Sequence, residues 1–293
     1  MESATLPWTR PDRLQGALLA ALFALAIVAW VATAERMGGM DMGPGTDPGT
    51  LGFFVVSWIV MMAAMMFPSI TPMVLVFARI QSQRRERGAV DEVVSSWIFV
   101  AGYLLVWMTF GLLAYAVFAT AQSLSIDALA WDRAGRWVAG GVIAAAAVYE
   151  LTPAKDACLR RCRGPLDFLM ERWREGRAGA LLMGIEHGAW CAGCCWGLMA
   201  ALFALGVMSV GWMVLIAGLI AVEKMLPWKA VAKYGVAVVL LALAIAVAAV
   251  PDDVPGLTVP GSMDSGSGHS GSMDEEMMKP ADEPTHRSMP MER

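Results

Sequence analysis

Long apolar segments occupy most of this chain and limit what it can fold into. A helix of about 20 apolar residues spans the roughly 30 Å hydrocarbon core of a bilayer and satisfies its own backbone polar groups there. Only 16% of the 293 residues are charged, against about a quarter in a soluble domain. We therefore predict an all-α, polytopic transmembrane helix bundle with about seven spans, near residues 14–34, 51–78, 93–119, 137–152, 179–206, 209–226 and 232–250.

Basic residues lie mainly in alternate connecting segments. Lys and Arg are frequent in 79–92 and 153–178 and sparse in the connections on the other side. Because cytoplasmic loops are enriched in these residues, we predict a multi-pass protein of the bacterial inner (cytoplasmic) membrane, with its N-terminus inside and its C-terminus outside. The first segment ends in VATAER, which resembles a signal-peptidase site. Its apolar run is longer than a usual signal core, so we expect an uncleaved span.

The chain divides into three regions. Residues 1–50 hold the first span and a Met- and Gly-rich outer loop, 51–250 form a six-span core, and 251–293 form an acidic, Met- and His-rich tail. The tail is dominated by Gly, Ser, Pro and acidic residues and cannot bury a core, so we expect it to be disordered. The segment 153–178 mixes basic and apolar residues, which is consistent with either an amphipathic helix on the inner membrane surface or a solvated connector.

The fifth apolar segment, MGIEHGAWCAGCCWGLM, carries soft metal ligands. At about 100° per residue, Met183, His187, Cys191 and Cys194 share one helix face, with Cys195 at its edge. Thioether, imidazole and thiolate groups favour Cu(I), with Zn(II) as the alternative. The competing interpretation is that these are small core cysteines and a hydrogen-bonding histidine. The glycines between them allow another helix to approach closely.

The second apolar segment offers methionines as further ligands. Met62 and Met66 lie on one helix face, and Pro68 and Pro72 are expected to interrupt and kink the helix. Broken helices in membranes often line binding sites. Packing against other helices is an equally simple role for these methionines.

Three glutamates occur within or at the ends of apolar segments. Glu150, Glu186 and Glu223 are expensive to place in a membrane and are therefore functional candidates. They could orient the imidazole of His187, ligate a hard metal, or take up protons that thiols release when metal binds. Glu150 and Glu223 lie near the inner boundary, where extension of the side chain to water is the alternative.

Cys158 and Cys162 form a C-x₃-C pair in the inner segment. A structural disulfide is not expected in the reducing cytosol. The pair is either a point where metal enters or leaves, or two incidental thiols.

The two predicted outer segments also contain soft metal ligands, namely methionine and histidine. Methionine thioethers do not form disulfides in an oxidising compartment and suit Cu(I) capture there. The competing interpretation is a low-complexity acidic tail with chance methionines. The candidate outer ligands are Met37, Met40, Met42, Met263, His269, Met273, Met277 and Met278.

Four stretches together resemble a known family: MMAAMMFPSITPM, YELTPAKDACLRRCRGPLDFL, MGIEHGAWCAGCCWGLM and AVEKMLP. The chain resembles an uncharacterised bacterial family of predicted metal-binding integral membrane proteins, a domain-of-unknown-function family, over residues 50–230. The resemblance implies a multi-span inner-membrane protein that binds metal, with no established reaction. The tail lies outside this region.

These features favour a membrane protein that transports Cu(I) or delivers it to an extracytoplasmic copper protein. We expect no catalytic residue, no nucleic-acid partner and no ATPase of its own, because no G-x₄-G-K-[ST] loop is present. The lipid bilayer is the other partner, and the oligomeric state is open. Three alternatives remain: a thiol–disulfide oxidoreductase using Cys191 and Cys194, a metal-dependent membrane oxidoreductase or hydrolase, and a structural subunit of a membrane complex.

Deleting residues 251–293 tests the proposed metal-collecting role of the tail. Because the tail lacks core-forming residues, we expect the truncated protein to keep its thermal stability, while cellular copper content falls at low external copper. Copper content that matches the full-length protein over a wide concentration range would contradict a capture role.

Overall fold

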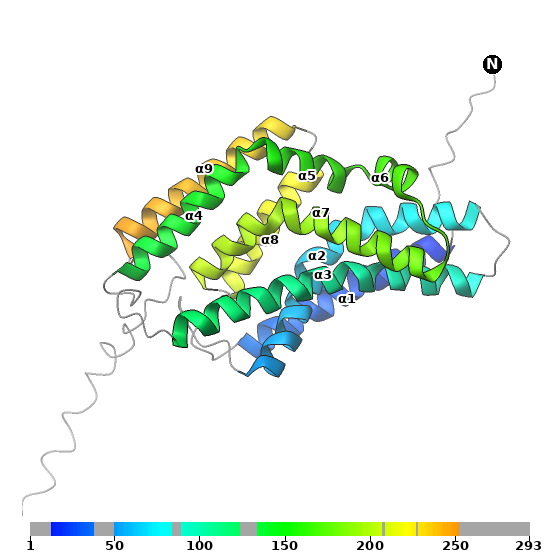
Figure 1. Ribbon diagram of the computed structural model, residues 1–293, viewed down its shortest axis with the longest axis horizontal. Coiled ribbons are helices and arrows are strands. Elements are labelled where there is room, and N and C mark those ends of the chain that lie inside the picture. The colour runs from blue at the N-terminus through cyan, green and yellow to red at the C-terminus, as the bar shows by residue number, and fades with distance from the viewer. Residues whose placement is uncertain are drawn as a thin grey trace, which may run out of the picture. The chain divides into compact units, whose positions relative to one another are not determined.

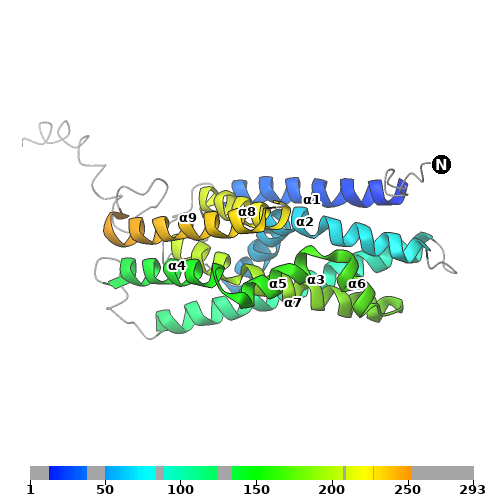
Figure 2. The same ribbon diagram turned by 90° about the horizontal axis from the view of Figure 1, so that it is seen from above.

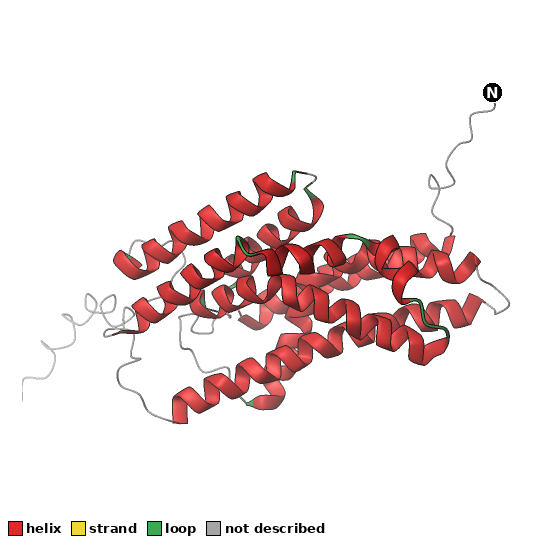
Figure 3. Cartoon of the chain, turned by 45° about the horizontal axis from the view of Figure 1, so that its top comes forward, coloured by secondary structure: helices red, strands yellow, loops and turns green. Residues whose placement is uncertain are grey.

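The computed structural model describes residues 13–37, 50–83, 89–123, 134–206, 209–226 and 228–251. Within these ranges the chain is helical and contains no strand, which confirms the all-α class (Figure 3). The helices, labelled in Figure 1, are α1 (Arg13–Met37), α2 (Leu51–Gln83), α3 (Ala89–Ser123), α4 (Arg136–Glu150), α5 (Pro153–Arg163), α6 (Pro165–Arg172), α7 (Gly176–Leu205), α8 (Val210–Met225) and α9 (Lys229–Ala249). Most of the predicted outer loop and almost all of the predicted tail lie outside the described residues, including Met40, Met42, Met263, His269, Met273, Met277 and Met278.

Each of the seven predicted apolar segments forms a helix. Among the described residues, α1, α2, α3, α7 and α9 are long and apolar enough to cross a membrane. A sixth span arises if α4 is taken together with α5, which continues at an angle of 68°. Helix α8, at 16 residues, is shorter than a typical span. Several apolar helices compatible with membrane association are therefore present, whereas the number of seven spans and their orientation stay predictions.

Helix α7 lies between several other helices. It packs against α3 along much of its length and also contacts α4, α5 and α8. Helices α4 and α9 lie side by side in both Figure 1 and Figure 2, and α1 packs on α2. Large apolar side chains remain exposed on the outer faces of α1, α4 and α9, which is the distribution that lipid contact requires.

The basic segment 153–178 forms two helices instead of one surface helix or a connector. Helix α5 packs on α7 and α8, and α6 packs on α2. Lys155 of α5 and Phe168 and Leu169 of α6 are buried. These side chains anchor both helices to the rest of the bundle, so a solvated connector is excluded.

The two prolines of α2 do not end the helix. Helix α2 continues from Leu51 to Gln83 with Pro68 and Pro72 inside it, and its two halves run in different directions in Figures 1 and 2. Thr71 Oγ1 donates a 2.7 Å hydrogen bond to the carbonyl oxygen of Phe67, near the region where the prolines remove backbone donors. The predicted kink is present, and the predicted interruption is wrong.

Glycines bring α3 and α7 into backbone contact. A Cβ atom at Gly184 of α7 would overlap the carbonyl oxygen of Phe99, and one at Gly102 of α3 would overlap that of Leu181. Gly188 is also tight, with an ideal Cβ 3.1 Å from the carbonyl oxygen of Tyr103. Small residues permit this close approach, which increases dispersion contacts between apolar helices.

Substituting Gly184 by alanine should therefore separate α3 from α7. We expect Gly184→Ala to lower stability by about 1–3 kcal/mol, the usual cost of overpacking, as a lower thermal midpoint of the detergent-solubilised protein. Gly141→Ala on α4 is the matched control, because nothing lies within 4 Å of its ideal Cβ and alanine favours helix. Equal midpoints for the two variants would show that the α3–α7 contact is not tight.

Candidate metal centre

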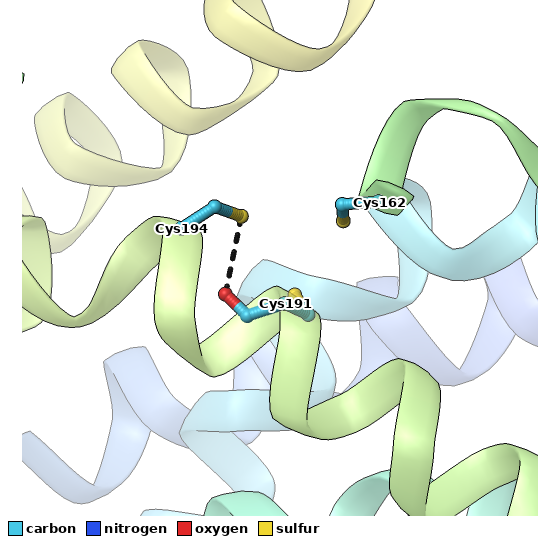
Figure 4. A group of neighbouring side chains, drawn as sticks. All are labelled: Cys162, Cys191 and Cys194. Atoms are coloured by element: carbon cyan, nitrogen blue, oxygen red, sulfur yellow. Dashed lines mark hydrogen bonds between the residues drawn. The ribbon is translucent and has the colours of Figure 1, made fainter. Parts of the chain in front are cut away.

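Two helices bring three cysteines together. Cys162 comes from α5, and Cys191 and Cys194 come from α7, as Figure 4 shows. Their three sulfur atoms all lie within 4.8 Å of one another. Cys191 and Cys194 are each 1% exposed, and Cys162 is half-buried. The described residues therefore contain a compact group of three soft donor atoms.

Local sequence explains how α5 reaches α7. Thr152 caps the start of α5 by accepting a hydrogen bond from the backbone amide of Lys155, and Pro153 occupies the first turn. On α7, Gly193 faces α5, and a Cβ there would lie 3.0 Å from the sulfur of Cys158. The absence of a side chain at Gly193 lets α5 approach closely enough for Cys162 to meet the α7 cysteines.

Cys191 is surrounded by hydrogen-bonding groups. Lys224 of α8 places Nζ 3.0 Å from the Cys191 sulfur, and the Tyr103 hydroxyl of α3 lies 3.1 Å from the same sulfur. An ammonium at this distance favours the thiolate over the thiol electrostatically. Cys191 is thus the member of the group best prepared to bind a metal cation.

The other two α7 cysteines contact each other and the helix backbone. Cys194 Sγ donates to the carbonyl oxygen of Cys191 at 3.2 Å, which is the dashed line in Figure 4. Cys195 Sγ lies 3.4 Å from Cys194 Sγ and is also buried. The predicted pair Cys191 and Cys194 is therefore together, with Cys195 immediately beside it.

His187 lies one turn before Cys191 but outside the three-sulfur group. Its ring packs against Phe99 and Tyr103 of α3 and Phe168 of α6, with centroid distances of 5.5–6.1 Å. It is 2% exposed, and its Nδ1 has no hydrogen-bond partner among the described residues. His187 therefore retains a nitrogen that is free to ligate, and its predicted role as a ligand stays a prediction.

The predicted methionine ligands are part of the apolar core. Met62 and Met66 of α2 and Met183 of α7 are each 0% exposed and belong to the main hydrophobic cluster. Met37, a candidate outer ligand, is the last residue of α1 and is also buried. Packing explains these positions, and metal binding by them stays a prediction.

The predicted glutamates all have basic partners. Glu150 and Glu223 both bind Lys155, whose Nζ lies 2.7 Å from each Glu223 oxygen. Glu186 forms a 2.9 Å ion pair with Arg172 of α6. In the structure, the first two carboxylates face a lysine, which the sequence analysis did not consider.

Three site residues are new relative to the sequence analysis. From the sequence, Cys162 is either part of a point of metal passage or an incidental thiol, and no role is predicted for Lys155 or Lys224. The signal that could have found them was the presence of lysines and cysteines directly beside apolar segments, in PAKDACLRRC and AVEKMLP. Nothing in that pattern shows that α5 folds back onto α7.

The donor set suits a soft metal ion. Thiolates favour Cu(I), which accepts low coordination numbers, whereas structural Zn(II) takes four ligands. Cys162, Cys191 and Cys194 supply three, with Cys195 Sγ 3.4 Å from Cys194 Sγ, and Glu150 and Glu223, the candidate hard-metal ligands, already bind Lys155. The three sulfurs therefore fit copper as cargo.

Replacing Lys224 tests the electrostatic account of Cys191. In a variant whose only cysteine is Cys191, Lys224→Met should slow alkylation by a small membrane-permeant reagent by roughly tenfold or more, since the nearby ammonium favours the reactive thiolate. Lys229→Met is the control, because Lys229 is exposed at the start of α9. Unchanged alkylation in Lys224→Met, measured by mass spectrometry, would refute this account.

Comparison with known protein families gives a match over most of the helical region. The model of the family described as PpoB2, copper chaperone, matches residues 55–247. This range runs from α2 into α9 and contains all three cysteines of the group. No curated protein and no solved structure matches the chain.

Proposed function

Since this chain belongs to the PpoB2 copper chaperone family, we propose that it binds Cu(I) at Cys162, Cys191 and Cys194 and passes it to an extracytoplasmic acceptor. The single observation that carries this proposal is the meeting of three cysteine sulfurs within 4.8 Å. Three soft donors in a buried position match the preference of Cu(I). The three cysteine sulfurs would thus be the atoms that bind copper in this member of the family.

The charge around the three sulfurs supports a monovalent cargo. Thiolate ligands bring negative charge into an apolar region, where unbalanced charge is costly. Lys224 Nζ, 3.0 Å from the Cys191 sulfur, offsets part of that charge and is itself half-buried. Copper carried as Cu(I) adds one further positive charge and needs no fourth ligand.

The division of the ligands between two helices supports delivery. Cys191 and Cys194 are fixed on the long helix α7, whereas Cys162 belongs to the short helix α5. In the proposed transfer, the Cu–S bond to Cys162 breaks first as a bond to an acceptor sulfur forms. The bonds to Cys194 and Cys191 are then exchanged in the same way, and copper remains Cu(I) throughout. The thiolate of Cys162 is released or takes up a proton from water, so no oxidant or reductant is required.

The apolar helices support a multi-pass location in the bacterial inner membrane. In that setting the cysteine group lies near the middle of α7, beside the inner end of α8, and the outer methionine segments collect or hand over copper at the outer surface. His187, with its unpartnered Nδ1 one turn from Cys191, serves as a further ligand during transfer.

A second candidate function rests on the contacts of Cys191. A buried thiol beside an ammonium and a tyrosine hydroxyl is also the environment of a reactive thiol in disulfide exchange. The partner thiol would be Cys194, on the next turn of α7. Copper content of the purified protein, measured with and without a strong reductant, separates the functions: a metal-binding protein keeps stoichiometric copper under reduction.

The two cysteines of α5 give a matched test of the copper site. Cys162→Ser should weaken Cu(I) binding by at least roughly tenfold. Loss of a residue that only hydrogen-bonds a metal ligand already costs about this much affinity, and Cys162 would be a ligand itself. Cys158→Ser should leave affinity unchanged, because Cys158 is outside the three-sulfur group and faces Gly193. Competition with a chromophoric Cu(I) chelator under reducing conditions measures both affinities.

Two results would contradict the assignment. One is a wild-type affinity in Cys162→Ser. The other is stoichiometric copper in a well-folded Cys191→Ser, Cys194→Ser double variant. A parallel titration with Zn(II) should show weaker binding than Cu(I) at this three-ligand site.

A further inference from the structure

Helix α5 is an unusual support for a metal ligand, because it is short and packs against the apolar core only through partly buried side chains, those of Cys158, Leu159 and Cys162. It is an 11-residue helix, and Lys155 is its only buried residue. Isolated helices of this length are marginal in water, and its last turn carries Arg160, Arg161 and Arg163. The polar contacts of α5 therefore add to this partial packing in fixing the position of Cys162.

Lys155 makes the central contact. Its Nζ donates to both carboxylate oxygens of Glu223 on α8, at 2.7 Å each, and to Glu150 at the end of α4. These contacts use the three donors of the ammonium group. The three side chains are 1–3% exposed, so water does not compete with them.

The two carboxylates have different mechanical roles. Glu150 precedes the bend of 68° between α4 and α5 and is close to Lys155 along the chain. Glu223 belongs to α8 and links α5 to a helix distant in sequence. Loss of Glu223 therefore removes a contact between helices, whereas loss of Glu150 leaves that contact in place.

The end of α8 contacts both halves of the cysteine group. Glu223 binds α5 through Lys155, and the next residue, Lys224, donates to the Cys191 sulfur of α7. Arg163, which follows Cys162, donates to the carbonyl oxygen of Leu226 just after α8. The last turn of α8 thus holds α5 at both of its ends while it contacts the α7 half of the site.

From this arrangement we infer that the Lys155–Glu223 ion pair holds Cys162 within reach of Cys191 and Cys194 and thereby completes the three-sulfur site. Lys155 and Glu223 are positioning residues, which act through Cys162. The inference rests on the proposed function for its copper consequence, but the position of Cys162 is a property of the chain without metal.

A metal-independent test measures how readily Cys162 meets Cys191. In a Cys158→Ser, Cys194→Ser, Cys195→Ser background, iodine oxidises the remaining two thiols to a disulfide in native membranes. Glu223→Ala should lower the rate of this reaction by about tenfold, since it removes two charge-assisted hydrogen bonds. Glu150→Ala is the matched control: it also leaves one carboxylate to balance Lys155, and its rate should stay within about twofold of the parent.

A second control separates buried from exposed contacts. Asp156 of α5 forms a 2.7 Å pair with Lys233 of α9, with side chains 42% and 21% exposed. Exposed pairs contribute little, so Asp156→Asn should not change the rate. If Glu223→Ala does not accumulate in membranes, Glu223→Gln replaces it; the isosteric amide keeps one acceptor, and a smaller decrease in rate is expected.

Copper coordination supplies the second readout. This experiment uses proteins that keep all of their cysteines. X-ray absorption should show three sulfur ligands per Cu(I) in the parent and in Glu150→Ala, and two sulfur ligands per Cu(I) in Glu223→Ala. Parent-like cross-linking in both Glu223 variants, or equal decreases in Glu150→Ala and Glu223→Ala, would overturn the positioning role. Absence of copper from the parent, together with the expected cross-linking rates, would instead refute the proposed function and leave the positioning role standing.

Discussion

Backbone contact through the glycines of α7 is the interaction on which the rest of the structure depends. Gly184 and Gly188 face the backbone of α3, Gly193 faces Cys158 of α5, and Gly197 faces Tyr149 of α4. Between apolar helices in lipid, close packing has to supply the attraction that water would otherwise provide. Because these glycines lie on several sides of one helix, α3, α4 and α5 can all pack closely against α7. The cysteines of α7 are consequently enclosed by all three.

The polar residues of the structure occur where this packing leaves them protected. Lys155 meets Glu150 and Glu223, and Lys224 meets Cys191, so each lysine of the α4–α5–α8 region that enters the bundle has acidic or thiol partners. A buried pair gives little net stability compared with apolar packing, but removing one partner is costly. Such pairs specify which surfaces meet. Here they specify, together with the partly buried side chains of Cys158, Leu159 and Cys162, how the short, basic helix α5 docks against its apolar neighbours.

A copper chaperone has to hold its ion firmly and still release it. A site built entirely on α7 would be rigid, and one built on loops would be imprecise. Sharing the site between α7 and α5 combines two fixed sulfurs with a third whose position depends on a small number of polar contacts. The buried His187 Nδ1 adds a donor nearby without belonging to the three-sulfur group. This division gives a physical route by which binding and delivery can occur at one place.

The sequence by itself determined the helical class, the approximate limits of the apolar segments and the soft-ligand face of α7, because helical periodicity and apolar length are local properties. It also indicated the close approach of another helix to the α7 glycines. Only the tertiary structure decided that Cys162 joins Cys191 and Cys194, and that Glu150 and Glu223 bind Lys155. These contacts between side chains depend on the bend between α4 and α5 and on the packing of α8 against α7 and α5. Periodicity places residues on a face of one helix, but it contains no information about which distant helix that face contacts.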